Sequence, residues 1–326
     1  MSSKRAMCCV VLFAAVCVPA AERPAAAAAD QNFPAKPIRL VVPQAPGGAN
    51  DLMARSVANY LTERLGRPVV VDNRAGADGI IGTEIVARSA PDGYTLLMVS
   101  AAYTTNAAVR KLPFDPHTAF DWVAMLGTGP TVLAVGPGLP VTSVKEVLAV
   151  AKAKPGEIIM ASGGGFQHFG SALFKSLSGL DFTIVVYKGG ALALLDVMGG
   201  RAHMTVGAMS VWLPHIRGGK VTALATGGAK RAAALPDLPT IAEAGVPGYD
   251  ANSWFALACA AGTPPAIVAR LNAEVAGYLK SPDTLKRFES IGAEVDIRTP
   301  EELRRMIPID MAKWARIARE AGLQAE

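Results

Sequence analysis

The stretch PIRLVVPQAPGGANDLMAR, residues 37–55, joins three patterns in a short space. Residues 38–42 are an apolar, β-branched run that is typical of a buried strand. Residues 43–48 form a turn rich in proline and glycine, and after Gly48 the apolar residues recur at helical spacing. A strand, a turn and a helix in this order predict the first unit of an α/β fold.

The same alternation continues along the chain. Residues 68–99 predict strand, helix and strand, and a second set of alternating elements begins near Thr131. In the second set we expect strands over residues 157–161, 182–187, 203–206 and 221–226 and helices over residues 167–177 and 191–198, with a further helix opened by the capping box of Ser143 and Glu146. Alternation at this spacing predicts βαβ units and mostly parallel sheets flanked by helices.

The chain after Cys259 contains much helix and little strand. The apolar run over residues 254–260 is typical of a strand, and three helical segments follow, the last opened by Thr299 with Pro300 and Glu302 in its first turn. Such a tail adds more easily to the first sheet than it forms a third domain. We therefore expect a discontinuous first lobe, two crossings between the lobes, and a hinge at the crossings.

The first 29 residues have the three parts of a secretory signal. Basic residues precede an apolar run over residues 7–18, which is shorter than the roughly 20 residues of a membrane span, and the alanines of residues 25–29 offer a cleavage site. Cys17 is a poor match to a lipidation box. We expect an exported protein whose mature part keeps only Cys259, so that no disulfide forms within the chain.

Motifs for catalysis, cofactors and nucleic acid are missing. The four histidines have no metal-ligand spacing, and neither a Gly-x-Ser-x-Gly elbow nor a dinucleotide or P-loop glycine pattern occurs. The formal net charge of +5 includes no basic run interleaved with aromatic residues. We predict no enzyme, no metal, no cofactor and no nucleic acid; the nearest to a hydrolase pair is Ser162 with His168.

Two glycine-rich turns remain as candidate sites, each between a predicted strand and a predicted helix. They are PQAPGGAND, residues 43–51, and ASGGGFQH, residues 161–168. A helix start leaves backbone N–H groups unpaired and can hold an anion, although either turn alone fits a tight bend that only needs glycine. Together they favour an anion held between facing helix starts. Asp51 also fits plain helix capping, and Tyr187 fits either a bond to a carboxylate or a core position.

Several segments resemble the substrate-binding receptors of tripartite tricarboxylate transporters, also called the Bug receptors. They include PIRLVVPQAPGGANDLMAR, LGRPVVVDNRAGADGIIGTEIVARSAPDGYTLLM, LPFDP, VVYKGGALALLDVMGGR, LPDLPTIAEAGVPGY and SWFALACAAGTPPAIVARLN. The resemblance extends from about residue 33 to the end of the chain. It implies a periplasmic solute-binding protein with the two-lobed flytrap fold, in which residues 30–128 and 255–326 form the first lobe and residues 129–254 the second.

The resemblance also implies how the ligand is held. In that family the main chain of two facing loops grips a carboxylate, and here the N–H groups of Ala45–Ala49 would do so in the first loop. Matched by position, the expected ligand-binding residues are Pro43, Gln44, Ala45, Pro46, Gly47, Gly48, Asp51, Ser100, Ala161, Ser162, Gly163, Gly164, Gly165, Phe166, His168 and Tyr187.

Departures from the family pattern narrow the range of expected ligands. Where amino-acid-binding members carry an aspartate, this chain has Gly207, so we expect a ligand without an amino group. Phe166 adds an apolar surface that suits a less polar acid. The expected partners are a dicarboxylate, tricarboxylate or aromatic carboxylate and the membrane permease of a tripartite transporter, with the receptor as a monomer. The alternative is a carboxylate-sensing subunit that docks on the kinase of a two-component system.

Overall fold

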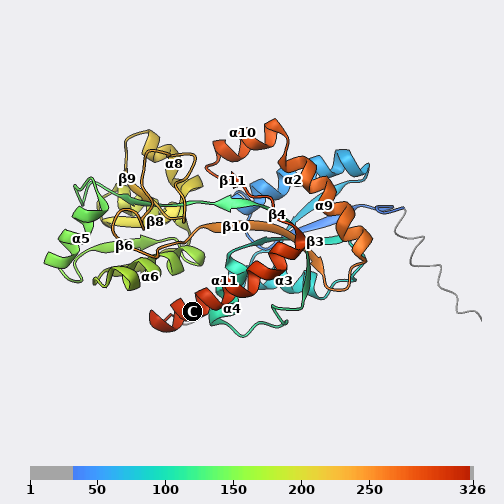
Figure 1. Ribbon diagram of the computed structural model, residues 1–326, viewed down its shortest axis with the longest axis horizontal. Helices are drawn as coiled ribbons and strands as arrows, with labels where there is room; N and C mark the ends of the chain where they lie inside the picture. Colours follow the sequence, from blue (N-terminus) through green and yellow to red (C-terminus); the bar gives the residue numbers. More distant parts are fainter. Residues whose placement is uncertain (1–31, 324–326) are drawn as a thin grey trace, which may run out of the picture. The chain divides into compact units, whose positions relative to one another are not determined.

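The computed structural model describes residues 32–323, and the predicted secretory signal lies outside this range. From Pro34 onward the chain forms one unit that contains two sheets flanked by helices (Figure 1). No helix within residues 32–323 is long and apolar enough to cross a membrane.

The first lobe is built on a six-stranded sheet in the order β11-β4-β10-β3-β1-β2. Its central strands are almost continuously buried and apolar, as strands covered by helices on both faces require. Its elements are β1 (Ile38–Val42), α2 (Ala49–Leu65), β2 (Val69–Asn73), the 3-10 turn η1 (Ala77–Gly79), α3 (Ile80–Ala87), β3 (Thr95–Ser100), α4 (Ala102–Val109), β4 (Phe120–Gly129), β10 (Ser253–Ala260), α9 (Pro265–Leu279), α10 (Pro282–Ser290), β11 (Glu294–Val295) and α11 (Pro300–Glu320).

The second lobe is built on a five-stranded sheet in the order β7-β6-β8-β5-β9. It repeats the strand, glycine turn and helix of the first lobe, because β6 and α6 occupy the places of β1 and α2. Its elements are β5 (Thr131–Val135), α5 (Val144–Ala153), β6 (Ile159–Ser162), α6 (Phe166–Ser178), β7 (Thr183–Val186), α7 (Gly190–Met198), β8 (Met204–Ala208), α8 (Met209–Arg217) and β9 (Thr222–Thr226).

The two-lobed α/β arrangement is confirmed, but the sheets are mixed rather than mostly parallel. β1 pairs in parallel with β2 and β3, as β6 does with β7 and β8. In contrast, β10 is antiparallel to β3 and β4, β11 to β4, and β5 to β8 and β9. The physical reason is the crossing between lobes: β4 carries the chain out of the first sheet and β10 carries it back, so these two neighbours must run in opposite directions.

The last helix contacts the hydrophobic cores of both lobes. Near its start, Leu303, Ile307 and Met311 pack in the same core cluster as the β4 and β10 tryptophans. Near its end, Trp314 and Ile317 pack in the core of the second lobe. The chain thus passes twice between the sheets, as expected. In addition, α11 links the two lobes by packing in both cores, which the sequence did not predict.

Five elements escaped the prediction from sequence: the short η1 and β11, and the longer α4, β4 and α8. α4 has the sequence AYTTNAAV, with few large apolar residues to show a helical period. β4 is a buried run that shows no alternation, and α8 contains Pro214, which usually indicates a break. The predicted start of the last helix is confirmed, because Thr299 and Glu302 form a capping box with Pro300 in the first turn.

Candidate functional site

The first glycine turn, between β1 and α2, is held from behind by a buried carboxylate. Asp51 is 3% exposed and accepts a hydrogen bond from the Gly47 N–H at 2.9 Å. It also accepts from Arg55 Nε and Asn73 Nδ2, each at 3.0 Å. Burial opposes ionisation, but these donors lower the pKa of Asp51 below its ordinary value. The ionised carboxylate therefore fixes the turn.

This bond changes which amides of the first turn can reach a ligand. The Gly47 N–H, expected among the donors of Ala45–Ala49, is already bonded to Asp51. Within residues 32–323 no acceptor is found for the N–H groups of Gly48, Ala49 and Asn50, which begin α2. The donors available to an anion are thus those of the helix start together with the N–H of Ala45, for which the described chain also holds no acceptor.

The second glycine turn, between β6 and α6, is held without a carboxylate. Gly164 and Gly165 have φ angles of 79° and 50°, which other residues rarely adopt. The Gly164 N–H donates to Ser162 Oγ at 3.3 Å, and Ser162 itself is fully buried. Ser162 therefore supports the turn from inside, while no acceptor in the described chain takes the N–H groups of Gly165 and Phe166.

Close backbone contact explains the first glycine of this turn. A Cβ added to Gly163 would lie 2.8 Å from the Gly190 nitrogen and would overlap Gln167 Oε1. Gly190 begins α7, so the turn packs directly on the start of the neighbouring helix. Any side chain at position 163 would force the two segments apart.

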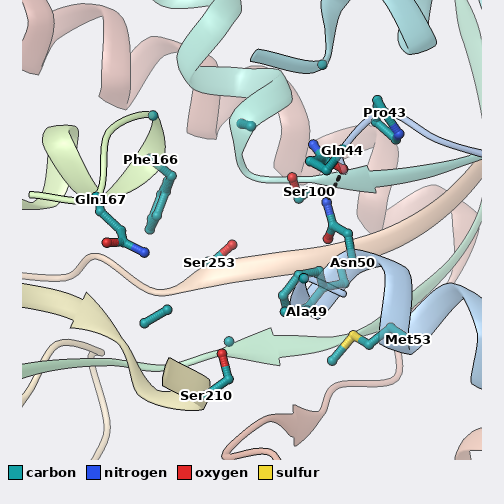
Figure 2. A pocket seen from close by; sticks show the side chains of 18 of the residues that line it. Pro43, Gln44, Ala49, Asn50, Met53, Ser100, Phe166, Gln167, Ser210 and Ser253 are labelled. Carbon is teal, nitrogen blue, oxygen red and sulfur yellow. Dashed lines mark hydrogen bonds between the residues drawn. The ribbon is translucent and has the colours of Figure 1, made fainter. Parts of the chain in front are cut away.

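A cavity of about 490 Å³ lies between the two turns, within the usual range for small-molecule sites. Figure 2 shows Gln44, Ala49 and Asn50 on one side and Phe166 and Gln167 on the other. Both lobes therefore contribute to it. The sequence-predicted residues that line it are Pro43, Gln44, Ala45, Gly48, Ser100, Gly163, Gly164, Gly165 and Phe166.

Other predicted residues do not line the cavity. They are Pro46, Gly47, Asp51, Ala161, Ser162, His168 and Tyr187. Ala161 and Ser162 belong to strand β6 and are fully buried. The Tyr187 hydroxyl donates to Asp196 Oδ2 at 2.6 Å, and partial burial together with this carboxylate raises the pKa of Tyr187. In this arrangement the Tyr187 hydroxyl stabilises its own lobe.

A third glycine turn lines the cavity and was missed. Residues 76–79 all have positive φ, between 46° and 139°, including the non-glycine residues Ala77 and Asp78. Asn106 Nδ2 donates to the Asp78 carbonyl at 3.0 Å, and Arg110 binds its carboxylate at 2.8 Å. The sequence signal was present: NRAGADG, residues 73–79, follows a predicted strand and precedes a predicted helix.

Polar side chains missed by sequence reasoning also line the cavity. Asn50, Asn106, Thr131, Gln167, Ser210 and Ser253 all contribute to it. They are widely separated in the chain and only the fold brings them together.

The cavity surface is largely apolar, with polar groups at separate points, and it lacks a positive side chain. No lysine, arginine or histidine of the described chain lines it, and its single charged lining residue, Asp78, is paired with Arg110. Amide N–H groups at helix starts and neutral side chains would therefore hold an anionic ligand. In residues 32–323 no group of three or more His, Cys, Asp or Glu residues could hold a metal ion.

Comparison with known proteins shows that the chain belongs to the tripartite tricarboxylate transporter receptor family. The family profile, "Tripartite tricarboxylate transporter family receptor", matches residues 53–323. Protein BugT of Bordetella pertussis is 38% identical over 303 residues, which cover 91% of this chain and 93% of the relative. Members of this family are solute-binding receptors, so this chain is a receptor and not an enzyme.

Two solved structures of similar chains contain a carboxylate. R. palustris Rpa4515 with adipate is 37% identical, with a TM-score of 0.81, covering 89% of this chain and 98% of that chain. MatC (Rpa3494) from Rhodopseudomonas palustris with bound malate is 30% identical, with a TM-score of 0.77, covering 87% and 99%. The periplasmic binding protein BugD is 31% identical, with a TM-score of 0.78, covering 90% and 100%. These relatives share the two-lobed fold described above.

Proposed function

We propose that this chain is an extracytoplasmic receptor that binds a small organic carboxylate between its lobes and delivers it to the membrane subunits of a tripartite transporter. The observation that carries this proposal is the cavity lined by glycine turns from both lobes, two of them at the starts of α2 and α6. The partial positive charge of a helix start attracts a carboxylate without any basic side chain. Relatives with adipate and malate support the same ligand class.

The residues predicted from the sequence divide into two roles. We propose that the predicted residues that line the cavity contact the ligand directly. Asp51 and Ser162 act one step behind them, because each accepts a hydrogen bond from an amide of its own turn. The ligand thus meets backbone donors whose directions are set by buried polar groups.

Ligand binding would favour a closed arrangement of the lobes. We take residues 30–128 with 255–326 as the first lobe and residues 129–254 as the second, with α11 as an additional contact to the second core. Since each lobe carries its own donors, a ligand gains bonds to both only when they approach. The closed surface would then be recognised by the permease.

We also propose that the receptor is exported to the periplasm. The sequence of residues 1–29 has the features of a cleavable signal, and relatives are described as periplasmic. The receptor would work in the periplasm. A kinase-docking sensor would use the same cavity, so uptake of the ligand by cells with and without the receptor distinguishes transport from sensing.

A thermal-shift screen tests the ligand class. The purified mature chain is heated with mono-, di-, tri- and aromatic carboxylates, and with sugars, amino acids and phosphate esters as controls. A ligand at a hundred times its Kd adds about 2.7 kcal/mol to the free energy of unfolding and raises Tm by several degrees. Stabilisation by carboxylates is expected. Stabilisation by another class alone would contradict the proposal.

A further inference from the structure

Asn50 carries an unpaired hydrogen-bond acceptor at the wall of the cavity. It is the second residue of α2, is 7% exposed and lines the cavity. Its Nδ2 donates to Gln44 Oε1, but its Oδ1 is buried with no hydrogen-bond partner in residues 32–323. Figure 2 shows this oxygen turned away from Gln44 and toward the side of the cavity where Ser253 lies. This oxygen is thus already shielded from water, and a ligand group that donates to it would supply the missing partner.

A covered acceptor without a donor is unfavourable. Leaving such a group unpaired costs about 1–3 kcal/mol, which a ligand can recover only by donating to it. A carboxylate cannot do so, because an ionised carboxylate only accepts. The ligand therefore needs a second functional group, with a proton to donate.

The charges around the cavity select among possible donors. An ammonium would call for a carboxylate nearby, but Asp78 is paired with Arg110 at 2.8 Å and Asp51 with Arg55 at 3.0 Å. Asp51 does not line the cavity. A neutral hydroxyl matches an amide oxygen without needing a counter-charge.

We propose that Asn50 Oδ1 accepts a hydrogen bond from a hydroxyl of the ligand, and that the receptor selects hydroxy-substituted organic acids over the corresponding acids without the hydroxyl. This inference rests on the proposed function and names its substrate class more closely. The two ligand-bearing relatives differ in this group, since malate carries a hydroxyl and adipate does not.

Matched pairs of acids test the inference. Affinities are measured by calorimetry for malate against succinate, 2-hydroxyadipate against adipate, citrate against tricarballylate, and mandelate against phenylacetate. In the pair whose carbon skeleton fits, the hydroxy acid is expected to bind about tenfold more tightly, the equivalent of one hydrogen bond. Equal binding, or tighter binding of the acid without the hydroxyl, would overturn the inference and leave the proposed function intact. Binding by no acid of any pair would overturn both.

Two variants at matching positions locate the effect. Asn50→Leu keeps the size of the side chain and removes the acceptor, so the tenfold preference should fall to near one; Asn50→Ala serves if the leucine variant does not fold. Gln167→Leu changes the second residue of α6, the matching position in the other lobe, where Figure 2 shows the amide nitrogen toward the cavity. The Gln167 Oε1 also has no partner in the described chain, but it lies against Gly163 of its own turn. The Gln167→Leu variant should weaken both members of a pair alike.

The variant results separate two roles of the Asn50 amide. If Asn50→Leu weakens both members of the pair equally, the Asn50 NH₂ group faces a carboxylate instead, and the inference fails. If the Asn50→Leu variant keeps the preference for the hydroxy acid, another group binds the hydroxyl, and the inference fails as well.

Discussion

The two glycine turns face one cavity but are stabilised by different means. In the first, the buried Asp51 carboxylate binds an amide of its own turn together with Arg55 and Asn73. In the second, no carboxylate takes part, and the residue that follows the glycines, Phe166, packs on Trp314 of α11 with ring centroids 5.1 Å apart. The first turn therefore depends on polar bonds within its lobe, whereas the second depends on the Ser162 hydroxyl and also on a helix far away in the sequence.

This difference teaches that similar glycine patterns can have different roles in closure. The support of the first turn lies wholly within its own lobe. The support of the second includes a helix that packs in both hydrophobic cores, and Phe166 itself contacts both core clusters. We therefore expect changes in the second turn to affect stability and ligand binding together, and changes in the first turn to be more local.

Among the variants that compare the two turns, Trp314→Ala should have the largest effect on stability. Trp314 is 1% exposed and contacts Phe166 and Phe169 edge to face. Removing a buried tryptophan costs about 3–5 kcal/mol, so the free energy of unfolding should fall by that amount in urea denaturation. Ligand affinity should fall too, while Trp314→Phe should keep much of both. A Trp314→Ala protein with normal affinity would show that α11 does not position the second turn.

Gly163→Ala should destabilise by about 2 kcal/mol, because the added methyl would be forced into the backbone of α7. Gly47→Ala is the matched control in the first turn, where a Cβ would have open space and only the positive φ of 87° is unfavourable. Thermal unfolding and ligand titration of both variants compare the turns. The packing predicts the larger loss of affinity for Gly163→Ala, so a larger loss from Gly47→Ala would contradict it.

Asp51→Asn should lower the free energy of unfolding by about 1.5 kcal/mol at neutral pH, since bonds to an ionised group are lost. The folded pKa of Asp51 is lowered, so its contribution is present above the ordinary carboxyl pKa and is lost as the pH falls through the folded value. The difference between wild type and variant should therefore shrink below about pH 4. Denaturation curves across this range measure it, and a difference independent of pH would argue against an ionised Asp51.

Tyr187→Phe should have the smallest effect. The hydroxyl donates to Asp196 within the second lobe, so its loss should cost about 0.5 kcal/mol and leave ligand affinity nearly unchanged. Calorimetric titration with the preferred carboxylate checks this. A clear loss of affinity would support the prediction, made from family resemblance, that Tyr187 contacts the ligand.

Much of the fold was predictable because its signals are local. The strand, glycine turn and helix at residues 38–65 and again at 159–178 follow from apolar runs, turn residues and helical spacing. Mixed pairing was not predictable, because the direction of β10 depends on where the chain returns and not on its own residues. The contact of α11 with both cores was not predictable for the same reason. Its apolar residues follow one helical pattern along the whole length, so the sequence does not show that its two ends pack in different cores.

The candidate site divides in the same way. Glycine turns at strand ends can be found in a sequence, and the third turn at residues 76–79 could have been recognised by the same signal. Asn50 and Gln167 could not be recognised as site residues from the sequence. Amide side chains are common at helix starts, and only the folded structure shows that these two line a cavity.

The sequence by itself determined the α/β class, the receptor family and two of the glycine turns, because these depend on patterns within a few tens of residues and on motif likeness. Only the tertiary structure decided which amides face the cavity, which carboxylate holds the first turn, and where an unpaired acceptor lies. Hydrogen bonds form between atoms that meet in space, and residues as distant as Asn50, Ser253 and Gln167 meet only after both lobes and their crossings have formed.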